Sequence, residues 1–150
     1  MSTVTIKTIE VCVKETEETV RFADEHFLQE PISYLKSNIA EFLFVESPDF
    51  DEIKVDSLAL EVDDIFKTYM ALFGLQGKKK EAETIRTFIE EKLQHNLNGF
   101  SISFSDNEGF WELNVPFDSL KGFDETMSIQ DALQLLYEAL VGLHEVRANN

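Results

Sequence analysis

The stretch GFSISFSDNEGFWELNVPFD, residues 99–118, contains two runs in which apolar and polar residues alternate. The turn DNEG, residues 106–109, separates the runs and ends in a glycine. Alternation with a period of two is typical of a strand with one buried face, and two such runs joined by a short glycine-containing loop predict a β-hairpin. We therefore expect a hairpin over about residues 100–116. The side chains expected to face the core are Phe100, Ile102, Phe104, Trp111, Leu113 and Val115.

The other face of this hairpin carries Phe110, Glu112 and Asn114, and its tip carries Asp106 and Glu108. If that face is in contact with water, Phe110 is an exposed aromatic side chain among acidic groups. Such a surface suits contact with a basic partner. On a wet face, replacing Phe110 with Ser should leave the stability nearly intact.

A second aromatic side chain in acidic surroundings is Phe50, within SPDFDE, residues 47–52. Two interpretations fit this segment: an exposed contact site, or a loop that one buried Phe anchors. On the first interpretation both segments contribute to one partner-binding surface. Its candidate residues are Asp49, Phe50, Asp51, Glu52, Asp106, Glu108, Phe110 and Glu112.

The amino-terminal third predicts one strand and two helices. The β-branched segment Thr3–Lys14 predicts a strand. Its apolar parity changes within the segment, which indicates either a bulge near Lys7 or Thr8 or two shorter strands. Residues 16–28 show a helical pattern with Thr16 as the cap. A second helix is expected from Pro31, continuing through Phe42 and Leu43. It should end before the segment ESPDFDE, which begins at Glu46, because Pro48 disfavours helix at the residue before it.

Residues 53–73 fit two patterns. Ile53 and Val55 alternate, which indicates a short extended piece, and a helix from about Ser57 to Phe73 is favoured after it. The alternative is a strand that continues to Val62, with the helix beginning at Asp63 or Asp64. The helical stripe consists of Leu58, Val62, Ile65, Tyr69 and Leu72.

Two later helices have clear signals. The loop LQGKKKEA, residues 75–82, precedes an amphipathic stripe that runs from Ile85 to Leu93 or Leu97, and we expect this helix to form a helical hairpin with the one from Ser57. The last helix has Ser128 as its cap, with Asp131 three residues later in the manner of a capping box. Its apolar stripe is Ile129, Ala132, Leu133, Leu136, Leu140 and Leu143.

Together these elements predict a single α+β domain over residues 1–150. We expect a small antiparallel sheet of three or four strands that includes the hairpin, packed with about five amphipathic helices. At 150 residues the chain is long enough to bury a core without cross-links. Its one cysteine, Cys12, lies in the apolar context IEVCV and is expected to be a small buried side chain, not a catalytic thiol.

The chain is strongly acidic, with a net charge of −16. Residues 41–64 contain nine acids and one base, and so do residues 97–146. This charge repels nucleic acid and anionic membranes and attracts a basic protein surface, although solubility alone also accounts for it. Residues 1–10 lack the features of a signal peptide, and no apolar run reaches the length of a membrane span, so the cytoplasm is expected.

Motifs for several kinds of chemistry are missing. There is no glycine-rich phosphate loop, no G-x-S-x-G, and no pair of His or Cys at metal-ligand spacing. The segment from Asp49 has Lys54 where a calcium loop needs glycine. No cofactor is expected.

These observations favour a non-enzymatic cytosolic interaction protein, such as an inhibitor, an immunity-type protein or a regulatory adaptor, that binds a protein with a basic surface. One alternative is a metal-dependent hydrolase of nucleotides or phosphoesters, which would use the carboxylate pairs Glu15/Glu18 and Glu61/Asp64. That spacing is similar to the acidic pairs of all-helical nucleotide pyrophosphohydrolases, although here the pairs are more than 40 residues apart. The other alternative is a homo-oligomeric structural protein with Phe110 or the last helix at its interface.

Overall fold

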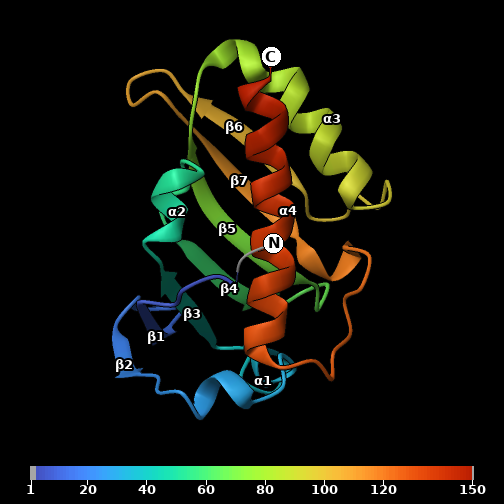
Figure 1. The fold of residues 1–150 in the computed structure, drawn as a ribbon. Helices are drawn as coiled ribbons and strands as arrows, with labels where there is room; N and C mark the ends of the chain where they lie inside the picture. The colour runs from blue at the N-terminus through green and yellow to red at the C-terminus, as the bar shows by residue number, and fades with distance from the viewer. Residues whose placement is uncertain (1–2, 150) are drawn as a thin grey trace.

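A seven-stranded antiparallel sheet forms the centre of the computed structural model, which describes residues 3–149. The strands lie in the order β2-β1-β3-β4-β5-β7-β6 (Figure 1). The prediction of a small sheet of three or four strands with about five helices is therefore wrong. The strands are β1 Thr8–Val13, β2 Thr19–Phe22, β3 Glu41–Glu46, β4 Leu58–Val62, β5 Tyr69–Gln76, β6 Ser101–Ser105 and β7 Phe110–Pro116.

One face of the sheet is covered by two helices, α4 (Ile129–Ala148) and α3 (Ala82–Lys92), which lie side by side in front of it in Figure 1. Two short helices lie at the ends of the central strands: α1 (Tyr34–Ser37) packs against β4, and α2 (Asp49–Glu52) connects β3 to β4. Single 3-10 turns η1, η2 and η3 occupy Phe27–Gln29, Lys79–Glu81 and Phe117–Ser119.

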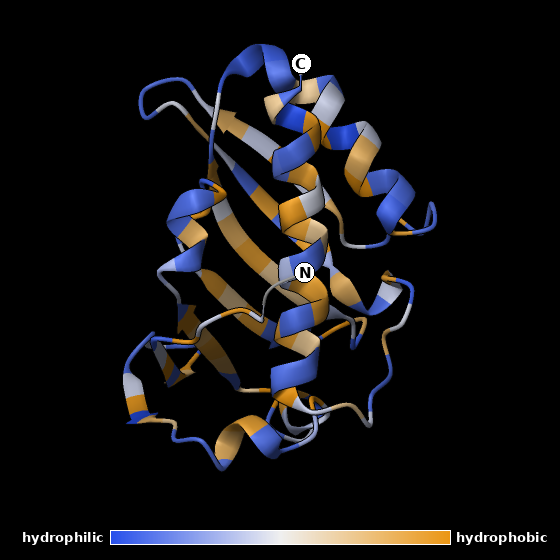
Figure 2. Cartoon of the chain, viewed as in Figure 1, coloured by the Kyte–Doolittle hydropathy of each residue, from blue (hydrophilic) through white to orange (hydrophobic). Residues whose placement is uncertain are grey.

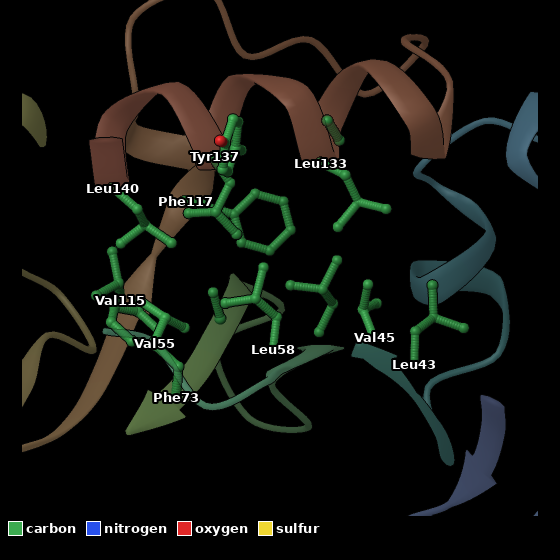
Figure 3. Close-up of a cluster of buried hydrophobic side chains, with 14 of the residues drawn as sticks. Leu43, Val45, Val55, Leu58, Phe73, Val115, Phe117, Leu133, Tyr137 and Leu140 are labelled. Carbon is green, nitrogen blue, oxygen red and sulfur yellow. The ribbon is translucent and has the colours of Figure 1, made fainter. Parts of the chain in front are cut away.

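The core fills the space between this face and α4. Figure 3 shows Leu133, Tyr137 and Leu140 of α4 pointing down onto Leu43, Val45 and Leu58 of the strands. The outer side of α4 is polar, and Figure 2 shows the alternation of hydrophilic and hydrophobic residues along it. A helix with one broad apolar side buries it most completely by lying flat on a sheet.

The last helix begins where its cap predicted. The Ser128 hydroxyl accepts a hydrogen bond from the Asp131 N–H at 3.0 Å. This bond satisfies one of the backbone donors that the first turn of a helix leaves unpaired. The predicted stripe is buried from Ile129 to Leu143, so both the start of α4 and its buried face are confirmed.

The hairpin at 100–116 is also confirmed. β6 pairs with β7, with Phe104 opposite Trp111 and Ile102 opposite Leu113. Trp111 is buried, and its ring centroid lies 4.8 Å from that of Phe104. On its other side β7 pairs with β5, so the hairpin is the end of a larger sheet.

The predicted helix at 57–73 is wrong, and so is the alternative helix from Asp63 or Asp64. This segment forms the hairpin β4–β5, with Val62 opposite Tyr69. β5 lies inside the sheet and is buried along most of its length, so it lacks the alternation that marks a strand with one wet face. The helical hairpin expected across residues 76–80 is absent for the same reason.

The two predicted amino-terminal helices are wrong as well. Residues 16–28 form the edge strand β2 and the turn η1, and the segment from Pro31 keeps only the single turn α1 before β3. In β3, Leu43 and Val45 face the core, while Phe42 and Phe44 face the other way. Because β3 has apolar side chains on both faces, some of them also fall three or four positions after earlier apolar residues. That spacing is the one expected of a helix, and it led to the wrong prediction.

The strand predicted within residues 3–14 is confirmed as β1, and Cys12 on it is buried, as expected. Burial raises the pKa of the Cys12 thiol, the opposite of what an activated nucleophile requires. The register irregularity lies between Val11 and Cys12, where β1 pairs with β2, and not near Lys7 or Thr8. Within residues 3–149, no helix combines the length and the apolar run that a bilayer crossing requires.

Candidate functional site: the uncovered sheet face

The face of the sheet opposite α3 and α4 has no helix on it in the described part of the chain. The buried residues of α1 to α4 all belong to the core on the first side, apart from Arg147. We call the opposite side the uncovered face. It carries apolar side chains that do not join the core cluster, namely Cys12, Phe42, Phe44, Ala59, Met70 and Leu72.

These side chains form a continuous row across the strands. Phe44 lies opposite Ala59, Ala59 opposite Leu72, and Leu72 opposite Asn114. Residues directly opposite one another on one face of a sheet are close enough for their side chains to touch. The row is therefore a half-buried apolar strip on which no described helix packs.

Further apolar side chains are exposed at the ends of the strands. Phe22 on β2 is 68% exposed and lies opposite Glu10, which in turn lies opposite Phe44. Ile65 and Phe66, in the turn between β4 and β5, are each 78% exposed. Large exposed apolar side chains that adjoin an apolar strip are a mark of an interaction surface.

A cleft of about 590 Å³, which we call the sheet cleft, opens on this face beside the β4–β5 turn. Phe66, Met70 and Leu72 give it apolar walls, and Glu61 and Asp63 are its charged groups. It contains no basic lining residue among those described. The remaining lining residues are Thr68, Asn98, Gly99 and Asn114.

The turn that holds Phe66 over the cleft is ordered by Asp63. One carboxylate oxygen of Asp63 accepts the N–H of Ile65 at 3.0 Å and that of Phe66 at 2.6 Å. Lys67 closes the turn with a φ of 58°. These hydrogen bonds fix the backbone of the turn, and Phe66 on it is largely exposed to solvent.

The cleft already interacts with one cation of the chain itself. The Lys14 ammonium lies 3.5 Å from the Glu61 carboxylate, and it donates to Asp64 Oδ1 at 2.9 Å and to the Val62 carbonyl at 2.6 Å. Glu10 and Glu112 add further carboxylates to the uncovered face, opposite Phe44 and Ser103 respectively. The face is therefore apolar in its centre and acidic around it.

The structure brings together three of the eight predicted partner-binding residues. Asp51, Glu108 and Phe110 line one shallow hollow of about 320 Å³, together with Asp56 and Lys54. The two acidic segments therefore lie next to each other at this hollow. The sequence alone did not show whether they share one face of the molecule. Phe110 is half-buried there.

The other predicted residues are scattered. Phe50 is 1% exposed and packs in the core, so the expectation that it is exposed is wrong, and it anchors its loop. Asp49 accepts the Thr5 N–H at 2.7 Å, and Glu52 is exposed. Asp106 lies at the hairpin tip, 4.0 Å from the Lys79 ammonium. Glu112 is exposed on the uncovered face.

The four carboxylates of the alternative metal site do not lie on facing helices. Glu15 and Glu18 are exposed in the turn between β1 and β2, whereas Glu61 is on β4 and Asp64 in the turn after it. Among residues 3–149 no group of three His, Cys, Asp or Glu side chains is placed to hold a metal ion.

The sequence interpretation missed Phe42, Phe44, Met70, Leu72 and Phe66. The sequence contained a signal for Phe42 and Phe44, because successive residues of a strand EFLFVE would place apolar side chains on both faces of a sheet. The comparisons with known proteins found no matching family model, no similar curated protein and no similar solved structure. Functional inference therefore starts from the arrangement of these side chains.

Proposed function

We propose that this chain is a non-enzymatic interaction protein whose uncovered face binds a partner protein that presents Lys or Arg side chains among apolar ones. The observation that carries the proposal is the strip of Phe44, Ala59 and Leu72, which lies outside the core and has acidic groups beside it. A fold gains nothing from apolar side chains left on a wet sheet face, whereas an interface buries them.

Charge complementarity supports this choice of partner. A Lys or Arg side chain entering the sheet cleft would place its aliphatic stem against Met70 and Leu72 and its charged end beside Glu61 and Asp63. Lys14 already contacts Glu61 in this way from within the chain. The net charge of −16 would steer a basic partner toward the molecule and make association fast and dependent on salt.

An inhibitor, an immunity-type protein and a regulatory adaptor are all compatible with such a face, and we place the protein in the cytoplasm as part of this proposal. A hydrolase has no comparable support, because the four carboxylates it would use are divided between separate turns and a strand. A second copy of this chain is a weaker occupant, since its uncovered face would bring the same negative charge.

Site-specific photo-crosslinking tests the proposal. A photoreactive phenylalanine analogue replaces Asn114, which is exposed in the sheet cleft, and in a control variant it replaces Glu138, which is exposed on α4. We expect salt-sensitive cross-links to a basic protein from position 114 and none from position 138. Equal cross-linking from both positions, or cross-links only between copies of this chain, would contradict the proposal.

The cross-linked protein is then purified and titrated against the wild type and against Glu61→Gln. Because Glu61 would lie beside the partner's cation, loss of its carboxylate should slow association and also speed dissociation, so that binding weakens by about fivefold or more. A matched Glu138→Gln variant should associate as the wild type does. If the two variants behave alike, the sheet cleft is not the contact.

A further inference from the structure

A second cavity, of about 600 Å³, lies at the other side of the molecule, where the end of β5, the start of α3 and the last turn of α4 converge. In Figure 1 this is the region where α3 and α4 approach the carboxyl terminus. We call it the basic pocket. Its cationic lining residues are Lys54, Lys78, Lys80 and Arg147, with His144 beside them.

The basic pocket reverses the charge of the molecule locally. Four of the chain's 13 Lys and Arg side chains line it, against one of its 29 acidic side chains, Glu81. Like charges repel, so basic residues that are scarce elsewhere are not expected to gather without an anion to hold. The cluster therefore points to an anionic ligand.

Arg147 is the fixed centre of the pocket. Its side chain is only 5% exposed. Nε donates to Glu81 Oε2 at 3.0 Å, and Nη2 donates to the Gln76 carbonyl at 2.5 Å and to Glu81 Oε1 at 3.3 Å. Nη1 is buried and has no hydrogen-bond partner among the described residues. A buried charged donor without an acceptor is costly, and an anion in the pocket would supply one.

His144, one helical turn before Arg147, adds a second unpaired group. Its Nδ1 is buried without a partner in the described part of the chain, and the residue lines the same pocket. Unpaired buried polar atoms are few in folded proteins. The two residues that carry these atoms, His144 and Arg147, both line the basic pocket, so a ligand bound there is the nearest source of the missing partners.

The single carboxylate of the pocket is already engaged. Glu81 accepts the Lys78 N–H at 2.7 Å as well as the bonds from Arg147. Burial alone would raise the pKa of the Glu81 carboxyl, but the hydrogen bonds and the attraction of Arg147 and Lys54 outweigh it and hold that pKa below its ordinary value. Glu81 therefore orients Arg147 and attracts Lys54, and it leaves Lys78 and Lys80 without a carboxylate partner among the residues that line the pocket.

The backbone around the pocket fits this arrangement closely. A Cβ on Gly77 would lie 2.5 Å from Arg147 Nη2 and 2.7 Å from Glu81 Oε1, so only glycine allows the guanidinium to approach the strand end. The Trp111 indole N–H donates to the Lys78 carbonyl at 3.2 Å and holds the following loop. The pocket is thus built on an ordered frame before any ligand arrives.

We propose that the basic pocket binds a small molecule through a phosphate group. A phosphate monoester carries close to two negative charges and several acceptor oxygens, which matches a guanidinium with a free N–H and three ammonium groups. The cavity is of a size typical for small-molecule sites and larger than phosphate alone needs. The acidic surface around it disfavours a long polyanion such as nucleic acid.

The full chain is titrated with inorganic phosphate and with ribose 5-phosphate at constant ionic strength. Binding is measured by the melting temperature and by the chemical shifts of the backbone amides in NMR spectra. Both ligands should raise the melting temperature in a saturable manner, and the shifted amides should lie around residues 76–81 and 144–148. Sodium chloride and citrate serve as the non-phosphate anions. If citrate binds as tightly as ribose 5-phosphate, the site is a general anion site and the assignment to phosphate is wrong.

Two adjacent lysines provide a matched pair of variants. Lys80 lines the basic pocket, whereas Lys79 does not and instead lies 4.0 Å from Asp106. Lys80→Ala should weaken phosphate binding by about threefold, the effect of one partly exposed ion pair, and Lys79→Ala should change it little. If both variants weaken binding equally, the effect comes from the general surface charge and not from the basic pocket. The absence of saturable phosphate binding to the wild type would overturn the proposal. The uncovered face is not involved, so Phe44→Ser should bind phosphate as the wild type does.

Discussion

Arg147 and Glu81 are 66 positions apart, yet Nε of Arg147 donates to Oε2 of Glu81 at 3.0 Å. The pair joins the last turn of α4 to the turn that precedes α3. It fixes the end of the longest helix against the end of β5, because Arg147 also donates to the Gln76 carbonyl. The pair is thus a structural link as well as the frame of the basic pocket.

Replacing Arg147 with Met should lower the free energy of unfolding by about 3 kcal/mol, because Glu81 would lose its partner in a largely buried position. Urea denaturation measures the change. The control is Lys36→Met, since Lys36 pairs with Glu125 while both side chains are more than 40% exposed. That variant should lose less than about 1 kcal/mol. Equal losses would show that the Arg147 pair is no stronger than a surface pair.

The same pair predicts an acid dependence. The pKa of Glu81 lies below its ordinary value of 4.5 in the folded protein, so near that pH the unfolded chain binds more protons than the folded one. The contribution of Glu81 to stability is present above pH 4.5 and is lost as the pH falls through the lower, folded value. The stability difference between the wild type and Glu81→Gln should therefore shrink from about pH 6 to about pH 3. A difference that stays constant would contradict the lowered pKa.

Tyr69 predicts an alkaline dependence. Burial, with smaller contributions from the charges of Glu125 and Asp118, raises its pKa from 10.0 to about 12. The folded protein keeps the phenolic proton where the unfolded chain loses it, so this contribution to stability is constant below pH 10 and falls as the pH rises toward 12. Tyr69→Phe should remove that fall.

The same substitution tests the Tyr69 hydroxyl at neutral pH. The hydroxyl oxygen is buried and has no hydrogen-bond partner in the described part of the chain. Removing it should raise the free energy of unfolding by about 1 kcal/mol, since an unpaired buried polar group carries a desolvation cost. Thermal and urea unfolding of Tyr69→Phe measure this. A clear loss of stability would show that the hydroxyl has an acceptor in solution.

Leu43 and Phe44 are adjacent on β3, and their side chains lie on opposite faces of the sheet. Leu43 is fully buried in the core, whereas Phe44 is half-buried on the uncovered face. Leu43→Ala should cost about 3 kcal/mol, the typical loss when a core leucine leaves a cavity. Phe44→Ala should cost about 1 kcal/mol or less and reduce binding of the proposed partner. Similar losses for both would show that the second face is also packed.

The cap of α4 gives a local prediction. Ser128→Ala removes the oxygen that accepts the Asp131 N–H and should lower the free energy of unfolding by about 1 kcal/mol. Ser128→Asp keeps an acceptor at the same place and should restore most of the loss. If the alanine variant is as stable as the wild type, the bond has no net value in solution.

Elements with a strong local signal were predictable. The hairpin of β6 and β7 has alternation on both strands and a glycine at its turn, and α4 has a cap and a full apolar stripe. In both cases neighbouring residues alone favour the structure that forms. The buried Cys12 belongs to the same group, because its apolar neighbours already indicated its surroundings.

The strands β3 and β5 were not predictable in this way. β5 lies between β4 and β7 and has apolar side chains on both faces, with Met70 and Leu72 on the uncovered face and the apolar residues that alternate with them in the core. Its sequence YMALFGLQ therefore has no alternation and fits a helix as well. β3 has apolar residues on both faces for the same reason, since Phe42 and Phe44 lie on the uncovered face. Local patterns cannot separate a strand with apolar side chains on both faces from a helix, because pairing partners decide between them.

The features of the fold and of the candidate sites also fall into those that the sequence determined and those that only the tertiary structure decided. The sequence by itself determined the acidic charge, the hairpin with its buried Trp111 and the capped helix α4, because each depends on composition or on residues close in the chain. Only the tertiary structure decided that one sheet face stays uncovered, that Asp51 meets Phe110, and that Arg147 meets Glu81. These relationships join segments far apart in the chain, and they form when long-range strand pairing and the packing of α4 bring those segments together.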